Sequence, residues 1–175
     1  MKLHTERLLL EPLGLQYLVT THKYASDLEN TRYMVHLPNL DLEETKSFLT
    51  NVEEEWNKDH PMFYEYAILL DKVHIGAVSL YRNEDNSEGE LGWIIDKQYW
   101  GNGYAVEAAQ VLIAFGKQEL KIHRFIAHCD SENSNSFKVM EKLGMSLECK
   151  TWGRKNKLSD EDREELMYSI EFEHN

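Results

Sequence analysis

The sequence of 175 residues is poor in residues that stiffen or cross-link a chain: it has three prolines and two cysteines. A chain of this length can bury a sizeable core without a disulfide, so we expect Cys129 and Cys149 to stay reduced. No apolar run approaches the roughly 18 residues of a membrane-spanning helix, and Leu8–Leu10 is too short for a signal-peptide core. We therefore expect a cytoplasmic protein with no membrane partner.

Positive charge is also scarce, with 19 Lys and Arg against 31 Asp and Glu and a net charge of −12. Nonspecific nucleic-acid binding depends on basic side chains that neutralise phosphates, so we do not expect a nucleic-acid partner. An acidic surface favours a cationic or amine-bearing substrate, although it also serves solubility alone. The metal-binding spacings C-x-x-C, H-E-x-x-H and that of the EF-hand are missing, so we expect no metal.

Hydrophobic periodicity predicts a single domain over residues 1–175, built from strands and helices. The expected strands are 5–12, 62–70, 73–82, 90–96, 124–129, 145–152 and 166–172, and the expected helices are 15–28, 41–58, 105–120 and 133–143. Short polar connections, among them the two-residue turn Asp71-Lys72, make the strands between 62 and 96 an antiparallel meander. Asp41 is the expected N-cap of the helix 41–58, and Gly144 is the expected glycine that ends the helix 133–143. The segment 90–129 reads as a right-handed β-α-β unit with parallel strands, so the sheet should be mixed.

Two of the nine glycines, Gly101 and Gly103, fall where the strand 90–96 gives way to a helix. The free N–H groups and dipole of a helix N-terminus attract an anion, and glycine lets that anion approach the backbone. The segment therefore predicts a phosphate or pyrophosphate site. A P-loop needs Lys-Ser/Thr after Gly103, and a dinucleotide fingerprint needs glycine at Val106, so neither applies. A tight turn with glycines for packing remains the alternative.

The pattern Gln98-x-x-Gly101-x-Gly103-x-Ala105 resembles the acetyl-CoA pyrophosphate loop of the GNAT N-acetyltransferases. Further segments resemble the branch of ribosomal-protein N-terminal acetyltransferases (RimJ/RimL-like): Thr5-Glu6-Arg7-Leu8, Glu90-Leu91-Gly92-Trp93, Trp100–Ala108, Asn133-x-x-Ser136 and Glu141–Met145. The resemblance covers nearly the whole chain. It implies an α/β fold with a mixed, mostly antiparallel central sheet, splayed around a β-α-β acetyl-CoA site and covered by helices on both faces.

The resemblance also implies acetyl-CoA as cosubstrate, with the pantetheine arm inserted between the strands 90–96 and 124–129. Backbone groups of the first strand would bond the pantetheine amides, and the glycine loop would hold the pyrophosphate. The implied contact residues are Ile94, Ile95, Gln98, Trp100, Gly101, Asn102, Gly103, Tyr104, Ala105, Asn133 and Ser136.

Acetyl transfer to an amine requires a neutral nucleophile, a stabilised oxyanion and a proton for the leaving thiolate. Glu90 is the candidate base, because Gly92 lies on the same side of the strand and leaves room for a substrate. A solvated carboxylate at the strand end is equally compatible with the sequence, and Glu88 is the second choice of base. Ser136 is the candidate acid or thiol partner, with a helix-capping serine as the alternative.

Many relatives carry a tyrosine acid at the position of Met140, which cannot donate a proton. Direct attack of the amine on the thioester is preferred to a covalent route through Cys129, because no histidine spacing supports an activated pair.

The leading hypothesis is acetyl-CoA-dependent N-acetylation of a primary amine, either a protein N-terminal α-amine or a small molecule. A homodimer is a further expectation, because dimers are common in families of this kind. The alternative is a non-catalytic acetyl-CoA sensor or interaction module, against which the presence of Glu90 counts. No motif identifies the acceptor.

Overall fold

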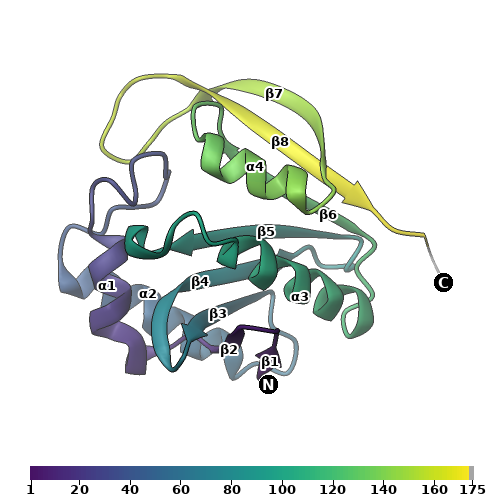
Figure 1. The fold of residues 1–175 in the computed structure, drawn as a ribbon, viewed down its shortest axis with the longest axis horizontal. Coiled ribbons are helices and arrows are strands. Elements are labelled where there is room, and N and C mark those ends of the chain that lie inside the picture. The colour runs from purple at the N-terminus through teal and green to yellow at the C-terminus, as the bar shows by residue number, and fades with distance from the viewer. Residues whose placement is uncertain (174–175) are drawn as a thin grey trace.

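The computed structural model describes residues 1–173 and contains one sheet of eight strands within them (Figure 1). The strands are β1 Leu3–His4, β2 Leu8–Pro12, β3 Phe63–Leu70, β4 Val73–Arg82, β5 Glu88–Ile95, β6 Arg124–Asp130, β7 Ser146–Arg154 and β8 Arg163–Glu171. The helices are α1 Leu18–Ala25, α2 Leu42–Trp56, α3 Tyr104–Gln118 and α4 Ser134–Lys142, with 3-10 turns η1 Leu15–Tyr17 and η2 Lys97–Tyr99.

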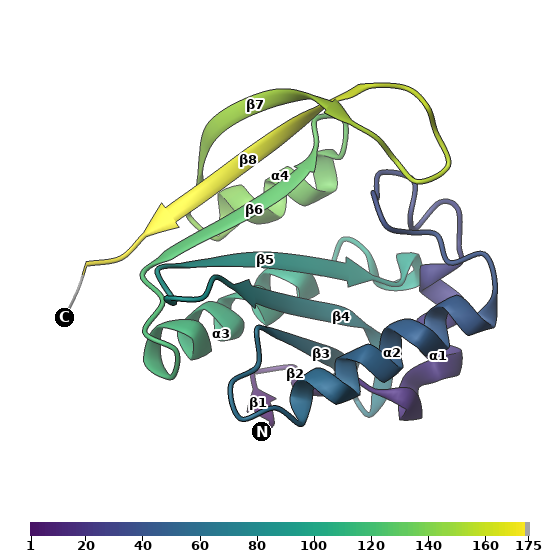
Figure 2. The same ribbon diagram turned by 180° about the vertical axis from the view of Figure 1, so that it is seen from behind.

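The strand order is β1-β2-β3-β4-β5-β6-β8-β7, and every neighbouring pair is antiparallel except β5 and β6. Helices α3 and α4 cover one face of the sheet, and α1 and α2 cover the other (Figures 1 and 2). The predicted fold class is confirmed, including the parallel β-α-β unit formed by β5, α3 and β6.

Local sequence signals explain several element boundaries. Asp71 and Lys72 adopt φ values of 48° and 70° and form the predicted two-residue turn between β3 and β4. The Asp41 side chain accepts a hydrogen bond from the Glu44 N–H and so caps α2. Gly144, with φ of 82°, follows the end of α4.

The strand expected over residues 5–12 begins only at Leu8, because residues 5–7 form a turn between β2 and the preceding short strand β1. The Thr5 hydroxyl accepts a hydrogen bond from the Leu8 N–H at 2.8 Å and also bonds the Leu8 carbonyl at 3.3 Å. A side chain that satisfies backbone groups in this way competes with the strand ladder. The expected helix 15–28 is also shorter, since only Leu18–Ala25 is α-helical.

The core has two parts, one on each face of the sheet. The larger part packs α3 and α4 against the sheet and includes the fully buried Phe125, Leu112 and Met140. The smaller part packs Leu49 and Val52 of α2 against β3 and β4. No helix in residues 1–173 is long and apolar enough to cross a membrane.

Candidate active site

The two parallel strands at the centre of the sheet separate along their length. β5 and β6 pair only at Glu88–Arg124, Gly89–Phe125 and Glu90–Ile126, and beyond these positions they diverge (Figure 2). Residues 91–95 and 127–130 therefore face an opening between the strands, which we call the wedge. Backbone groups on its sides lack a strand partner and are available to an extended ligand.

Hydrogen-bond alternation decides which backbone groups of β5 face the wedge. The Asp96 N–H donates to the Ile75 carbonyl at 2.8 Å, so the even-numbered residues of β5 bond β4. Trp93 and Ile95 consequently direct their N–H and C=O groups toward the wedge, whereas Ile94 directs its own toward β4. The sequence analysis named Ile94 and Ile95 and missed Trp93, because the direction depends on the register with β4.

The far end of β5 is closed by side chains from other segments. The Ile95 carbonyl accepts hydrogen bonds from Trp100 Nε1 at 2.8 Å and from Asn30 Nδ2 at 3.0 Å. Asn30 also accepts a bond from the Lys97 N–H at 2.6 Å, which ties the α1–α2 connection to this strand end. The wedge therefore keeps the N–H and C=O of Trp93 and the N–H of Ile95 for a ligand.

The glycine loop lies directly after β5 and leads into α3. Gly101 and Gly103 both have φ of 78°, a region that disfavours side chains. Gly103 is the N-cap of α3 and supplies no side-chain cap, so the first-turn N–H groups have no side-chain acceptor. The loop is braced by Asn102, whose Nδ2 donates to the carbonyls of Tyr99 and Trp100 at 3.0 Å each.

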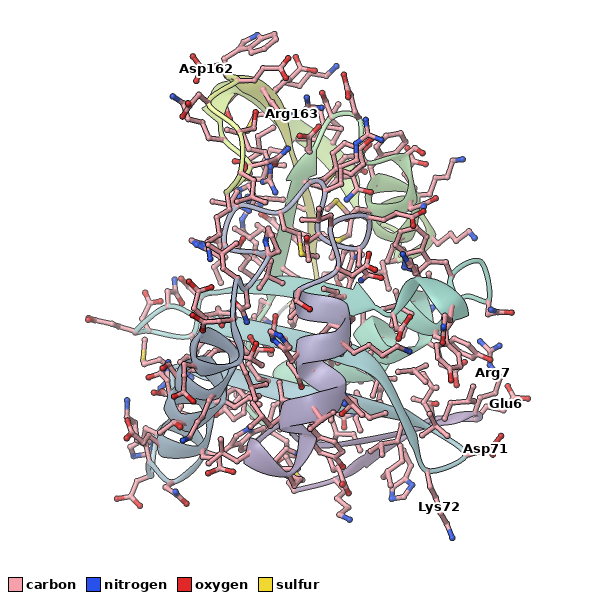
Figure 3. All side chains as sticks on the ribbon, turned by 90° about the vertical axis from the view of Figure 1, so that its left-hand side faces the viewer. Glu6, Arg7, Asp71, Lys72, Asp162 and Arg163 are labelled. Carbon is pink, nitrogen blue, oxygen red and sulfur yellow. The ribbon has the colours of Figure 1, made fainter. Side chains whose placement is uncertain are left out.

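An ion pair joins the N-terminal segment to this loop. Arg7 binds the Glu107 carboxylate through Nε at 2.7 Å and Nη2 at 2.6 Å, and its Nη1 donates to the Asn102 carbonyl at 3.0 Å. Arg7 also lies 4.7 Å from the Tyr104 ring centroid, beside the start of α3 (Figure 3). Burial opposes ionisation of Glu107, but hydrogen bonds from Thr5 and Arg7 hold its pKa below the ordinary value. Two motifs that looked independent in the sequence thus form one contact.

The remaining residues of the loop segment are also placed by local contacts. Gln98 accepts a hydrogen bond from Lys23 of α1 at 3.1 Å, so its side chain is turned toward that helix. Trp100 is partly exposed and, as noted, closes the end of β5. Ala105 is partly buried against the main core within the first turn of α3.

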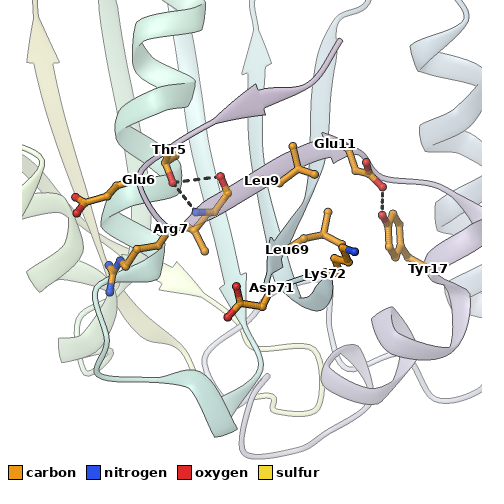
Figure 4. Close-up of a pocket in the computed structure, with 10 residues that line it drawn as sticks. Thr5, Glu6, Arg7, Leu9, Glu11, Tyr17, Leu69, Asp71 and Lys72 are labelled. Carbon is orange, nitrogen blue, oxygen red and sulfur yellow. Dashed lines mark hydrogen bonds between the residues drawn. The ribbon is translucent and has the colours of Figure 1, made fainter.

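Two open hollows lie on the surface near the N-terminal segment. One, of about 580 Å³, is lined by His4, Arg7 and Gly103 together with Lys142 at the end of α4. The other, of about 560 Å³, lies over β2 and the β3–β4 turn (Figure 4). Of the three carboxylates that line it, Glu6, Glu11 and Asp71, Glu11 is already bound by Lys2 and Tyr17. Only the first hollow adjoins the uncapped start of α3.

Glu90, the candidate base, lies on the face of the sheet that α1 and α2 cover, opposite the face that α3 and α4 cover. Glu90 accepts a hydrogen bond at 2.8 Å from Nδ1 of His128, whose side chain is 26% exposed. This bond raises the pKa of His128 above its ordinary value. Glu88, the second choice, binds Arg124 at 2.8 Å and is therefore committed to an ion pair. Sequence reasoning missed the contact with His128, because it depends on the β5–β6 register: Ile126 is opposite Glu90, and His128 lies two residues further along β6 on the same face.

The other side of the wedge carries Cys129 and the start of α4. The Asn133 side chain accepts from the Ser136 N–H at 3.3 Å and so caps α4, and the Ser136 side chain hydrogen-bonds that of Cys129. Burial raises the pKa of the Cys129 thiol to about 11. Met140 is fully buried in the core. Within residues 1–173 no group of three or more His, Cys, Asp or Glu side chains is arranged to hold a metal ion.

Comparison with known proteins agrees with this geometry. The chain is 31% identical over 151 residues to the uncharacterized N-acetyltransferase YnaD of Bacillus subtilis. The aligned residues make up 85% of this chain and 84% of the relative. A GNAT-family acetyltransferase structure from Bacillus anthracis matches with a TM-score of 0.83 at 28% identity over 98% of both chains. RimL, a ribosomal L7/L12 alpha-N-protein acetyltransferase solved with coenzyme A, shares the fold with a TM-score of 0.82 at 18% identity over 98% of both chains.

A family model described as an acetyltransferase (GNAT) domain matches residues 7–146. This range includes the wedge, the glycine loop and the Glu90–His128 pair. The chain therefore belongs to the GNAT family of acetyl-CoA-dependent acetyltransferases.

Proposed function

We propose that this protein transfers the acetyl group of acetyl-CoA to a primary amine by direct attack of the amine on the thioester. The observation that carries the proposal is the wedge between β5 and β6 beside the uncapped N-terminus of α3. The five segments that resemble RimJ/RimL-like proteins support placement in that branch, with a protein N-terminus or a small amine as acceptor.

The residues of the wedge and loop fit an extended ligand that carries phosphates. Trp93 and Ile95 offer unpaired backbone groups, as an added strand would require. Gly101 and Gly103 keep side chains away from the N–H groups at the start of α3, where a pyrophosphate is stabilised. The hollow of about 580 Å³ beside Gly103, which presents His4, Arg7 and Lys142, suits the outer phosphate-bearing part of the molecule. Bound acetyl-CoA supplies the activated acetyl thioester.

Glu90 receives the proton that the attacking amine loses. A primary alkyl ammonium group has a pKa of about 10.4, so at neutral pH it must lose a proton before it can attack. One carboxylate oxygen of Glu90 is held by His128, and the side chain is 49% exposed, so the other oxygen is accessible to an amine or to a bridging water. His128 fixes the orientation of the carboxylate. The pair lies at the end of β5–β6 pairing, where the wedge opens.

Ser136 assists the departing thiolate from the other side of the wedge. Its side chain hydrogen-bonds that of Cys129 and sits in the first turn of α4, where the helix dipole also favours negative charge. Cys129 itself is a protonated thiol at neutral pH because burial raises its pKa to about 11. A protonated thiol is a weak nucleophile, which supports direct transfer over an acetyl-cysteine intermediate.

The test combines ligand binding with turnover. A saturating concentration of acetyl-CoA, about 100 times Kd, should stabilise the fold by about 2.7 kcal/mol and raise Tm, whereas ATP and NAD should leave Tm unchanged. Thiol release should then be measured with a panel of small amines and N-terminal peptides. No change in Tm with acetyl-CoA contradicts the proposal. A change in Tm without turnover of any amine favours the non-catalytic sensor.

A further inference from the structure

The buried carboxylates of this protein differ in how their charge is compensated. Four are buried within residues 1–173: Glu55, Glu65, Asp96 and Asp130. Three of them bind a cationic side chain of the same chain, namely Lys58 for Glu55, Lys23 for Asp96 and Arg163 for Asp130. A buried carboxylate usually has such a partner, because an unpaired buried charge is costly.

Glu65 is the exception among these four. It is 8% exposed, and its carboxylate accepts a hydrogen bond at 2.8 Å from the neutral Tyr81 hydroxyl. Burial raises the pKa of Glu65 to about 7, and the bond from Tyr81 offsets this only in part. For Glu55, by contrast, hydrogen bonds from Lys58 and from the Met62 N–H outweigh burial and hold its pKa below the ordinary value.

The strand register places Glu65 on the same face of the sheet as the candidate base. Glu65 on β3 is opposite Ser79 on β4, which is opposite Gly92 on β5. Residues that lie opposite one another across the strands form a row, and in the next row on this face Tyr81 on β4 is opposite Glu90 on β5. Two strand spacings of about 4.8 Å place the Glu65 and Gly92 backbones about 10 Å apart.

Burial changes from row to row across this face. Ala67 and Ala77, one row further under α2, are 0% and 5% exposed. Tyr81, in the row of Glu90, is 41% exposed. Glu65 and Ser79 therefore lie at the edge of the helix cover, where the sheet face becomes accessible.

Gly92, at the β5 end of the row of Glu65 and Ser79, has little above it on this face. A Cβ atom at this position would lie 2.7 Å from the Ser79 hydroxyl, and apart from its chain neighbours no other atom would lie within 4 Å. The absence of a side chain keeps the surface between Glu65 and Glu90 low, so an acceptor can lie across it. The polar groups around this space are two carboxylates, a hydroxyl, a phenol and the His128 imidazole.

We propose that Glu65 is a specificity residue that binds a second positive charge of the acceptor, and that the acceptor is therefore a diamine or polyamine. One ammonium group would replace the missing internal cation at Glu65, while the other amine reaches Glu90 at the wedge. The inference rests on the proposed acetyl transfer and adds the substrate class. No covalent step involves Glu65.

The test compares diamines with monoamines of equal carbon number in the wild-type protein. Thiol release from acetyl-CoA should be measured with 1,3-diaminopropane, 1,4-diaminobutane, 1,6-diaminohexane and 1,8-diaminooctane against the matching alkylamines. We expect kcat/KM for the best diamine to exceed that of its monoamine by about 10- to 100-fold, as expected for a hydrogen bond to a charged group. Calorimetry should show the same preference in binding to the protein loaded with coenzyme A, without turnover.

Glu65→Gln should remove this preference by raising KM for the diamine and leaving KM for the monoamine and Kd for acetyl-CoA unchanged. Glu11→Gln is the matched control, because Glu11 also bonds a tyrosine hydroxyl but has Lys2 as its cation. The control should keep the diamine preference. If Glu65→Gln does not fold, the wild-type comparison alone decides.

Equal kcat/KM for diamines and monoamines overturns the assignment of Glu65, as does equal loss for both classes in the variant. Turnover of neutral-side-chain peptides without turnover of any diamine overturns it too, while the acetyltransferase proposal stands. Failure to bind acetyl-CoA is the distinct result that rejects the proposed function itself.

Discussion

The two sides of the proposed active site are built in different ways. The proposed cofactor side consists mainly of backbone groups from one continuous segment, which runs from Trp93 through the glycine loop to the start of α3. The proposed acceptor side consists of side chains from four strands, with Glu65 on β3, Tyr81 on β4, Glu90 on β5 and His128 on β6. A site made of backbone groups requires glycine at fixed spacing, so it can be recognised in the sequence. A site made of side chains from several strands depends on strand register, so the sequence alone does not reveal it.

The largest expected effect is on the acceptor side. Glu90→Gln should lower kcat by about 10²- to 10⁴-fold, because glutamine keeps the shape but cannot take the proton of the amine. Kd for acetyl-CoA should not change, which separates the two sides of the site. A thiol-release assay measures kcat, and calorimetry measures Kd for acetyl-CoA.

Glu88→Gln is the control for that variant, since Glu88 is on the same strand but is bound to Arg124. Its kcat should stay within about threefold of wild type, the small change expected away from the reacting atoms. A larger loss in Glu88→Gln than in Glu90→Gln would transfer the role of base to Glu88.

The next effect concerns the backbone site. Gly103→Glu should weaken acetyl-CoA binding by about 100-fold or more, because it places a carboxylate beside the N–H groups at which we propose that the pyrophosphate binds. Gly153→Glu is a matched control: Gly153 also has positive φ, 100°, and no atom lies within 4 Å of its added Cβ. The control therefore also places a side chain at a positive φ, but away from the loop. Equal Kd values in the two variants would place the phosphate site elsewhere.

The contrast between features formed by neighbouring residues and features formed by distant ones also explains which parts of the fold the sequence predicts. The Asp71–Lys72 turn, the Asp41 cap and the Gly144 stop depend on residues close together in the chain, and all three were predicted correctly. The division of β1 from β2 was missed because propensity favours a strand there, whereas the Thr5 side chain bonds the backbone of Leu8.

The contacts of the proposed site also divide into local ones, which the sequence reveals, and long-range ones, which it does not. Gly101 and Gly103 were found from their spacing, and the structure shows why glycine suits both positions. The Glu90–His128 contact spans 38 residues and the Tyr81–Glu65 contact spans 16, so neither follows from a local pattern. Their discovery requires the pairing of β3, β4, β5 and β6, which hydrophobic alternation alone does not fix.

A smaller effect is expected at the ion pair that joins the N-terminal segment to the glycine loop. Arg7→Ala should weaken acetyl-CoA binding by about tenfold, because Arg7 holds the Asn102 carbonyl and neutralises Glu107 beside the phosphate loop. Calorimetric Kd is the measurement. Arg32→Ala is the control, since Arg32 also lies over a tyrosine ring, at 5.3 Å from the Tyr33 centroid, without a contact to the loop. Unchanged Kd in Arg7→Ala would show that the loop holds its shape without the ion pair.

The smallest effect is expected at Ser136, on the side of the wedge formed by β6 and α4. If its hydroxyl stabilises the leaving thiolate, Ser136→Ala should lower kcat by about three- to tenfold and leave Kd for acetyl-CoA unchanged. The helix cap itself should survive, because the Asn133 side chain accepts from the Ser136 backbone N–H, which alanine retains. Ser134→Ala removes a hydroxyl from the same first turn at an exposed position and should leave kcat unchanged. A fall in Tm with unchanged kcat would instead assign Ser136 to the packing of α4 against Cys129, and the acid would then have to be sought outside this helix.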